Sequence, residues 1–231
     1  MIQARTAETG TVRATRSRPG TAARRAEIVA VASRLFRERG YHGVGMRAIA
    51  EAADIQAASL YHHFASKEEL LLESIYVVDR DLVVDQLPIL EGAGTYRERF
   101  GRLVRGHVRH IGANRDAWWV AGRELRALSP EKLDEVQVYR RRYQHALGEF
   151  LAAGAAAGEF SCEDPRLSAL AVLDMINGPN EWWEPGGRLA IDELAARYAA
   201  LALRLVGAEP APGAPAGPGR GQARKRSSSA R

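Results

Sequence analysis

The sequence predicts an all-α protein, and three observations lead to that fold class. Apolar residues recur three and four positions apart along every strong segment, which is the period of an amphipathic helix. Helix-start signals occur at three places, where a side chain able to cap a helix precedes its first turn. They are the capping box Ser66-Lys67-Glu68-Glu69 and the pairs Ser129-Pro130 and Asp164-Pro165. No segment shows the alternating pattern of a β-strand.

The amino-terminal part of the chain predicts three helices before the capping box. The first should run from about Thr21, a candidate N-cap, to Arg39, and Gly40 should end it in the C′ position. The stretch from Gly45 to Phe64 then predicts two short helices separated by a tight turn. Two such helices form a helix-turn-helix, whose second helix fits the major groove of B-DNA.

The rest of the chain predicts longer helices. A fourth helix starts at the capping box and should end by Pro88, since proline lacks the backbone donor that a helix interior requires. The helices expected after it are Tyr96 to Ala113, Asp116 to Leu128, Ser129-Pro130 to Ala153 or beyond, Asp164-Pro165 to about Asn177, and Ile191 to Val206.

Three motifs carry a resemblance to a known family. They are RLFRERGYHG (34–43), MRAIAEAADI (46–55) and SLYHHFASKEELL (59–71), in the order and at the spacing of the amino-terminal domain of TetR family repressors, which the chain resembles over about 24–81. The resemblance implies a TetR-like fold of about nine helices, with an amino-terminal three-helix helix-turn-helix domain and a carboxyl-terminal helical bundle for ligand binding and dimerisation. The expected domains are a disordered basic arm (1–20), the DNA-binding domain (21–82, motif 45–64), the ligand and dimer domain (83–207) and a disordered basic tail (208–231).

The second short helix supplies most candidates for DNA contact. A reading helix needs exposed small or hydrogen-bonding side chains near its start, with groups beside them that grip phosphate. The resemblance adds Tyr61 and Lys67 as phosphate contacts, and Arg47 is a candidate for phosphate or base edges. The full set is Arg47, Gln56, Ala57, Ala58, Ser59, Tyr61, His62, His63 and Lys67. Packing of Tyr61 against the fourth helix and simple solvation of the two histidines are the competing interpretations.

The turn of this motif departs from the family's usual Ala-Gly-Val-Ser, because the chain has Ala53-Asp54-Ile55-Gln56. Asp adopts a left-handed backbone more readily than most residues but less readily than Gly. Gln56 is a weaker N-cap than Ser. We therefore expect altered hydrogen bonding at the turn, and operator preference cannot be transferred from relatives.

Aromatic side chains concentrate in the carboxyl-terminal part, among segments rich in Ala and Gly, which suits a ligand cavity with a few large walls. The candidates for effector binding are Trp118, Trp119, Arg123, Tyr139, Tyr143, Met175, Asn177, Trp182 and Trp183, with His107 and Asn180 as further polar groups. An ordinary aromatic core is the competing interpretation. The stretch DMINGPNEWWEPGGRL (174–189) looks like a TetR subgroup that controls steroid and fatty-acid catabolism and responds to acyl-CoA thioesters. This looser resemblance implies a bulky, largely apolar effector.

Symmetry predicts a homodimer, because palindromic half-sites on DNA require a protein with a two-fold axis. In the TetR family the last two helices of each subunit form a four-helix bundle with the partner's. The matching positions here are Leu167, Leu170, Ala171, Asp174, Leu194, Tyr198, Leu201 and Leu205. Burial within one subunit is the competing interpretation for each.

Composition limits the function further. The 231 residues carry a net charge of +5, with +5 on residues 1–25 and +4 on residues 208–231, so the body of the chain is acidic. The lack of a membrane-length apolar run and the single cysteine, Cys162, favour a cytoplasmic protein without membrane association. The i, i+3 pair His107 and His110 has no further ligands nearby, so no metal is expected, and no cofactor.

None of the GxSxG, P-loop, CxxC and HExxH motifs occurs, so the sequence does not predict an enzyme. The resemblance implies a ligand-responsive transcriptional repressor that a small, largely apolar effector releases from its operator. Two alternatives to this function stay open. A nonspecific or architectural DNA-binding protein would use the basic ends of the chain to attract phosphate. A TetR-type activator would use the same helix-turn-helix with the opposite effect on transcription.

Overall fold

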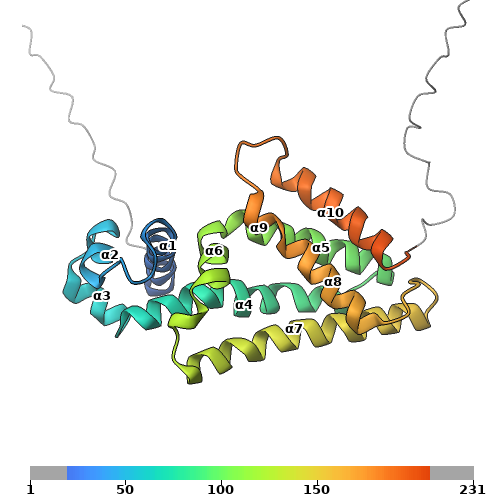
Figure 1. Ribbon diagram of the computed structural model, residues 1–231, viewed down its shortest axis with the longest axis horizontal. Coiled ribbons are helices and arrows are strands. Elements are labelled where there is room, and N and C mark those ends of the chain that lie inside the picture. Colours follow the sequence, from blue (N-terminus) through green and yellow to red (C-terminus); the bar gives the residue numbers. More distant parts are fainter. Residues whose placement is uncertain (1–19, 209–231) are drawn as a thin grey trace, which may run out of the picture. The chain divides into compact units, whose positions relative to one another are not determined.

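A computed structural model describes residues 20–208, so the expected basic arm and basic tail lie almost entirely outside the described residues. The α-helices are α1 (Thr21–Arg39), α2 (Met46–Ala52), α3 (Ala57–His63), α4 (Lys67–Glu91), α5 (Tyr96–Ala113), α6 (Arg115–Arg123), α7 (Pro130–Ala156), α8 (Pro165–Asn177), α9 (Pro179–Trp182) and α10 (Ile191–Leu205) (Figure 1). A 3₁₀ turn, η1 (Leu125–Ala127), follows α6, and residues 20–208 contain no strand. Because α9 is a single turn, the expected all-α fold of about nine helices is confirmed.

The chain forms two compact units. The first contains the described residues up to Leu82 together with Ala113–Arg140, and the second contains Val83–Gly112 and the described residues from Arg141 onward. Both α4 and α7 contribute residues to each unit. The expected ligand and dimer domain was a continuous 83–207, whereas residues 113–140 group with the amino-terminal helices.

The first unit is built around one apolar core. Its largest side chains are fully buried and come from α1 through α4: Ile28, Phe36, Ile49, Leu60, Phe64, Leu70, Leu71 and Ile75. One polar pair lies among them, because Ser33 Oγ of α1 is hydrogen-bonded to Ser74 Oγ of α4 at 2.9 Å. Each hydroxyl also lies within bonding distance of a carbonyl one turn back in its own helix, so the buried pair is satisfied and joins α1 to α4.

Two of the helix-start signals act as expected. Ser66 Oγ accepts from the Glu69 N–H at 3.1 Å, and Glu69 Oε2 accepts from the Ala65 N–H at 2.7 Å, one residue earlier than in the usual capping box. Asp164 Oδ1 accepts from the Leu167 N–H at 3.0 Å and caps α8. These bonds are local, which is why the sequence shows them.

Helix α1 has the expected bounds, but Thr21 is its first helical residue and Gly20 is its N-cap, without a side-chain bond. Two other expected boundaries are wrong. Helix α4 continues past Pro88 to Glu91, since only the last turn follows the proline and few backbone bonds are lost there. The helix expected to reach Leu128 ends at Arg123, and the Glu124 side chain instead accepts from the Tyr41 N–H at 3.2 Å.

The second unit has its own core. Phe100, Leu103 and Ile111 of α5 are buried with Leu147 of α7 and Ile176 of α8. Phe160 packs edge-on against Phe100 with ring centroids 5.7 Å apart. Within residues 20–208, none of the helices has the length and apolar character needed to cross a membrane, and no group of three metal-ligating side chains forms.

Candidate nucleic-acid interface

The turn between α2 and α3 is a Schellman motif with Asp54 at its left-handed position. Asp54 has a φ of 53° and is the only non-glycine residue with positive φ in the described part of the chain. Its N–H donates to Glu51 O at 3.1 Å, and the Ile55 N–H donates to Ala50 O at 3.0 Å. Asp54 therefore occupies the left-handed position that glycine usually fills in this motif. The sequence indicated this, because Asp54 stands where the usual turn of the resembled family has glycine.

Helix α3 begins without a side-chain cap. Gln56 is the N-cap residue, with φ −69° and ψ 145°, and its side chain makes no capping hydrogen bond. The first N–H groups of α3 consequently lack a protein side-chain acceptor at the N-cap. The Gln56 amide is exposed and is left available for other contacts.

The side chains of α3 divide cleanly between core and solvent. Leu60 is completely buried, and Phe64, just after the helix, is 1% exposed. Gln56, Ala58, Tyr61 and His62 are exposed, whereas Ala57, Ser59 and His63 are partly covered. Tyr61 is 55% exposed, so it is not part of the core. Arg47, on α2, is exposed as well.

Lys67 is engaged in a way that the sequence did not reveal. Its Nζ donates to Tyr41 O at 2.9 Å and to Val44 O at 3.0 Å, and it lies 4.2 Å from the centroid of the Tyr41 ring. An ammonium has three donors, so two of them hold the loop between α1 and α2 and one is left for a phosphate. The expected phosphate contact is thus also a structural contact.

Two arginines that the sequence analysis did not single out also reach the helix-turn-helix. Arg24 and Arg25, adjacent on α1, donate to backbone carbonyls before and at the end of α3. Their partners are 29 and 38 residues away in sequence, so no local pattern indicates these bonds.

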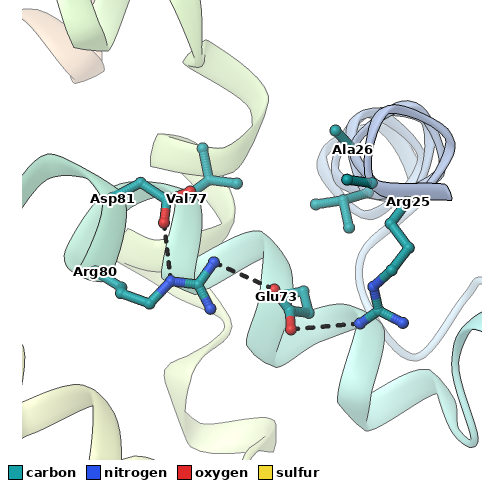
Figure 2. A pocket seen from close by; sticks show the side chains of 8 residues that line it. Arg25, Ala26, Glu73, Val77, Arg80 and Asp81 are labelled. Atoms are coloured by element: carbon teal, nitrogen blue, oxygen red, sulfur yellow. Dashed lines mark hydrogen bonds and ion pairs between the residues drawn. The ribbon is translucent and has the colours of Figure 1, made fainter. Parts of the chain in front are cut away.

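An open hollow of about 230 Å³ lies between α1 and α4 in the same unit. Figure 2 shows the charged side chains on its wall: Arg25, Glu73, Arg80 and Asp81. Glu73 lies 3.5 Å from Arg25 Nη2 and 3.6 Å from Arg80 Nη2, and Arg80 Nε bonds Asp81 at 2.9 Å. Its floor is lined by small apolar side chains, including Ala26 and Val77. None of these residues was among the candidates.

The nine effector candidates are divided between the two compact units. Trp118, Trp119, Arg123 and Tyr139 belong to the first unit, and Tyr143, Met175, Asn177, Trp182 and Trp183 belong to the second. Trp118 and Trp183 are buried, and the Trp183 Nε1–H donates to Leu189 O at 2.9 Å, so both fit the core interpretation. Trp182 is 53% exposed.

Two of these candidates lie around His107 in the second unit, where His107 and Tyr143 are buried and Asn177 is exposed. His107 Nε2 lies 2.9 Å from Asn177 Oδ1, and Nδ1 lies 3.3 Å from the Tyr143 hydroxyl. Burial lowers the pKa of His107 to about 3, so the ring is neutral at pH 7. The network assigns the proton to Nε2, which donates to Asn177, while Nδ1 accepts from Tyr143. Burial also raises the pKa of the Tyr143 hydroxyl, which stays a donor.

The dimer candidates lie mostly on the surface of the subunit. Helices α8 and α10 contact each other, and Leu167, Leu170, Leu201 and Leu205 are exposed by 63, 44, 45 and 40%. Ala171 and Asp174 are exposed, and Tyr198 is partly covered beside Trp182, with ring centroids 6.5 Å apart. Leu194 is only 2% exposed and belongs to the core of its own subunit, which corrects its assignment to the interface.

Comparison with known proteins identifies two family models. Residues 28–74 match the model described as bacterial regulatory proteins, tetR family, and residues 93–206 match a Tetracyclin repressor-like, C-terminal domain. The HTH-type transcriptional repressor KstR2 of Rhodococcus jostii (strain RHA1) is 29% identical over 186 residues, which cover 80% of this chain and 91% of that protein.

Two solved structures extend the comparison. The TetR family transcriptional regulator PfmR from Thermus thermophilus superposes with a TM-score of 0.71 at 33% identity, covering 79% of this chain and 99% of that one. The structure of AibR in complex with isovaleryl coenzyme A and operator DNA gives a TM-score of 0.68 at 27% identity, covering 80% and 100%. These matches include both the helix-turn-helix and the carboxyl-terminal helices.

Proposed function

Because this chain belongs to the TetR family of bacterial transcriptional regulators, we propose that it is a homodimeric repressor that binds a palindromic operator and is released by a small, largely apolar effector. Members of this family regulate transcription and are not enzymes. The proposal places DNA reading on α3, dimerisation on α8 and α10, and effector binding among the carboxyl-terminal helices. A protein with this role acts where the chromosome lies, in the cytoplasm.

One observation carries the DNA-binding part of the proposal. Helix α3 exposes Gln56, Ala58, Tyr61 and His62 while Leu60 anchors it in the core. A carboxamide can bond adenine in two places, and a methyl group can lie against thymine, so these side chains suit the major groove. Tyr61 and Arg47 have the exposure and chemistry to hold the flanking phosphates.

The exposed leucines support the homodimer. Leu167, Leu170, Leu201 and Leu205 are large apolar side chains on two helices that contact each other within the second unit. An exposed apolar patch of this kind commonly marks a protein interface. A closed two-fold dimer would cover the same patch on both subunits, and two-fold symmetry matches a palindromic operator.

The effector proposal has two supports. The hydrogen-bonded group His107–Tyr143–Asn177 extends from the apolar core of the second unit to its surface, and a few polar groups beside apolar side chains are typical of a small-molecule site. The AibR structure contains isovaleryl coenzyme A together with operator DNA, and KstR2 is a related repressor. We infer an effector of the acyl-CoA type, whose apolar acyl chain would enter the second unit.

Protection of DNA near the gene for this protein tests the proposal. We expect a footprint of limited length with two-fold symmetry, which the effector removes at saturating concentration. A version of the protein that lacks residues 1–19 and 209–231 should keep the same footprint, because α3 rather than the basic ends determines specificity.

The competing function, nonspecific or architectural binding through the basic ends, predicts uniform protection that disappears when those ends are removed. A TetR-type activator predicts the same footprint but a loss of transcription when the gene is deleted. The footprint of the shortened protein and the change in transcription after gene deletion therefore distinguish a repressor, an activator and a nonspecific DNA-binding protein.

A further inference from the structure

We propose that Arg24 and Arg25 are positioning residues for DNA reading, which hold the turn before α3 and the end of α3 and so fix the orientation of that helix. This inference rests on the proposed function of α3. Neither residue was a candidate for DNA contact, and their role follows from the backbone carbonyls that they bind.

Arg24 holds the turn that leads into α3. Its Nη2 donates to Ala53 O at 2.9 Å and to Asp54 O at 3.5 Å, while its Nη1 bonds Glu27 at 2.7 Å. Ala53 is the C-cap of α2, and carbonyls at a helix end lack partners within the helix. A cation at this position also interacts favourably with the negative end of the helix dipole.

Arg25 holds the other end of α3. Its Nη1 donates to the carbonyl of His63, the last residue of α3, and its guanidinium carbon lies 4.1 Å from the centroid of the Phe64 ring. Its Nη2 faces two carboxylates of α4, Glu69 at 3.6 Å and Glu73 at 3.5 Å. The planar guanidinium thus joins α1, the end of α3 and α4 through one rigid group.

Arg24 and Arg25 are neighbours on α1, but successive side chains of a helix point about 100° apart. One of them therefore reaches the turn before α3 and the other reaches its end. Helix α3 has seven residues and is therefore about 10 Å long at 1.5 Å per residue. It has no side-chain N-cap and little length of its own, so an isolated helix of this size would not be stable in water. Fixing carbonyls in the turn before α3 and at its last residue limits its freedom to tilt on the core.

Arg25 also connects α3 to the charged wall of the hollow. Figure 2 shows Glu73 between Arg25 and Arg80, with Arg80 bonded in turn to Asp81. Opposite charges alternate through the linked pairs Arg25–Glu73, Glu73–Arg80 and Arg80–Asp81, so Arg25 is held by a network instead of by a single flexible ion pair. A shift of α4 would therefore move the end of α3 through Glu73 and Arg25.

The alternative is that these arginines contact phosphate directly, since their side chains are 29 and 35% exposed. The salt dependence of binding separates the two roles. Each phosphate contact contributes about 0.9 to the slope of log affinity against log salt, whereas a positioning residue contributes nothing to it. A positioning residue should matter for the operator and not for a duplex of random sequence.

The experiment uses the full chain with Arg24→Met, Arg25→Met and Arg25→Lys. The control is Arg34→Met, which removes the same charge from an exposed place on α1. Affinity is measured at several salt concentrations for the operator and for a scrambled duplex of equal length. We expect Arg24→Met and Arg25→Met to weaken operator binding about tenfold more than the control, because hydrogen bonds to bases weaken steeply with distance and angle. Binding to the scrambled duplex and the salt slope should equal those of the control.

The conservative variant and hydrogen exchange complete the test. Arg25→Lys should recover part of the operator affinity, since an ammonium can reach the His63 carbonyl but cannot form the full set of bonds. In DNA-free protein, the amides of residues 56–64 should exchange faster in the methionine variants than in the control. This second measurement does not depend on any operator.

Several results would overturn the proposal. One is that the methionine variants match the control both in the amide exchange of residues 56–64 and in operator affinity. Another is that they lose the same affinity for the operator and for the scrambled duplex, with a salt slope reduced by about 1. If the wild-type protein preferred no duplex, the proposed function would fail, while the exchange measurement would still decide whether the arginines fix α3.

Discussion

The buried His107 makes the stability of this protein depend on pH in a predictable direction. Its ring is fully enclosed, and burial lowers its pKa from the ordinary 6.5 to about 3. Above pH 6.5 the ring is neutral in both the folded and the unfolded chain. Between about pH 6.5 and 3 only the unfolded chain binds the proton, so the free energy of unfolding falls as the pH falls.

The magnitude follows from the separation of the two pKa values. Each pH unit in that window removes about 1.4 kcal/mol, so His107 should account for a loss of about 2 kcal/mol between pH 7 and pH 5. No discount for solvent screening applies, because the side chain is 1% exposed. A loss of this size is a substantial part of the stability of a typical domain.

Urea unfolding at pH 7, 6 and 5 measures this loss. The proteins compared are the wild type, His107→Gln and His145→Gln, where His145 is an exposed histidine of α7 beside Glu149. Protein concentration must be equal in all samples, because dimerisation would otherwise change the apparent stability. The wild type and His145→Gln should each lose about 2 kcal/mol more than His107→Gln on going from pH 7 to pH 5.

The change in the free energy of unfolding with pH can be compared between the proteins even if His107→Gln is less stable at every pH. Titration of all other groups occurs in each protein and cancels in the difference. An identical pH dependence in the wild type and in His107→Gln would show that the ring does not remain neutral in the folded state. The assignment of the His107–Tyr143–Asn177 network would then be incorrect.

Three further predictions concern the turn, the reading helix and the dimer. Asp54→Gly should raise the free energy of unfolding by about 1 kcal/mol, because glycine adopts the left-handed backbone without strain. Urea unfolding measures this change, and a loss of stability would contradict the turn geometry. Tyr61→Phe should weaken operator binding about fivefold, because one hydrogen bond is lost. The Tm should not change, because the side chain is exposed. Unchanged operator affinity at fixed salt would exclude Tyr61 as a phosphate contact. Leu201→Glu should raise the Kd of the dimer at least about a hundredfold, since it places an unpaired charge in an apolar interface. Sedimentation should show no such effect for Val84→Glu, which places the same charge at another exposed apolar position of the same unit, and a dimer unaffected by Leu201→Glu would place the interface elsewhere.

The parts of the structure that the sequence predicted are those set by neighbouring residues. The capping bond of Ser66 and the N-cap of Asp164 are made within three residues. The left-handed Asp54 could be anticipated because its position in the motif usually holds glycine. The buried positions of α2 and α3 follow from helical periodicity, so the division of α3 into a core side and an exposed side was also predictable.

The parts that the sequence did not predict depend on distant partners. Nothing local shows that Arg24 and Arg25 bond carbonyls in the helix-turn-helix or that Lys67 binds Tyr41 O and Val44 O. A basic residue near a DNA-binding motif is equally compatible with a phosphate contact and with a structural one. Only the fold decides between them.

The carboxyl-terminal helices show the same limit. An apolar residue at a helical interval of α10 can be buried in its own core or exposed, and Leu194 and Leu201 carry the same pattern although Leu194 is buried and Leu201 is exposed. Most of the effector candidates are aromatic, a property shared by core and cavity residues. Their distribution over two compact units could not be seen from residue type.

Selection of duplexes from a pool of random sequence tests the central claim most directly, because the claim is that the exposed side of α3 reads DNA. The purified wild-type protein should enrich a palindrome whose two half-sites are related by two-fold symmetry. Gln56→Ala should keep the spacing of the half-sites but relax the preference at one base position in each. Enrichment of no palindrome by the wild type, or an identical base preference in Gln56→Ala and in variants of the other exposed residues of α3, would contradict the account.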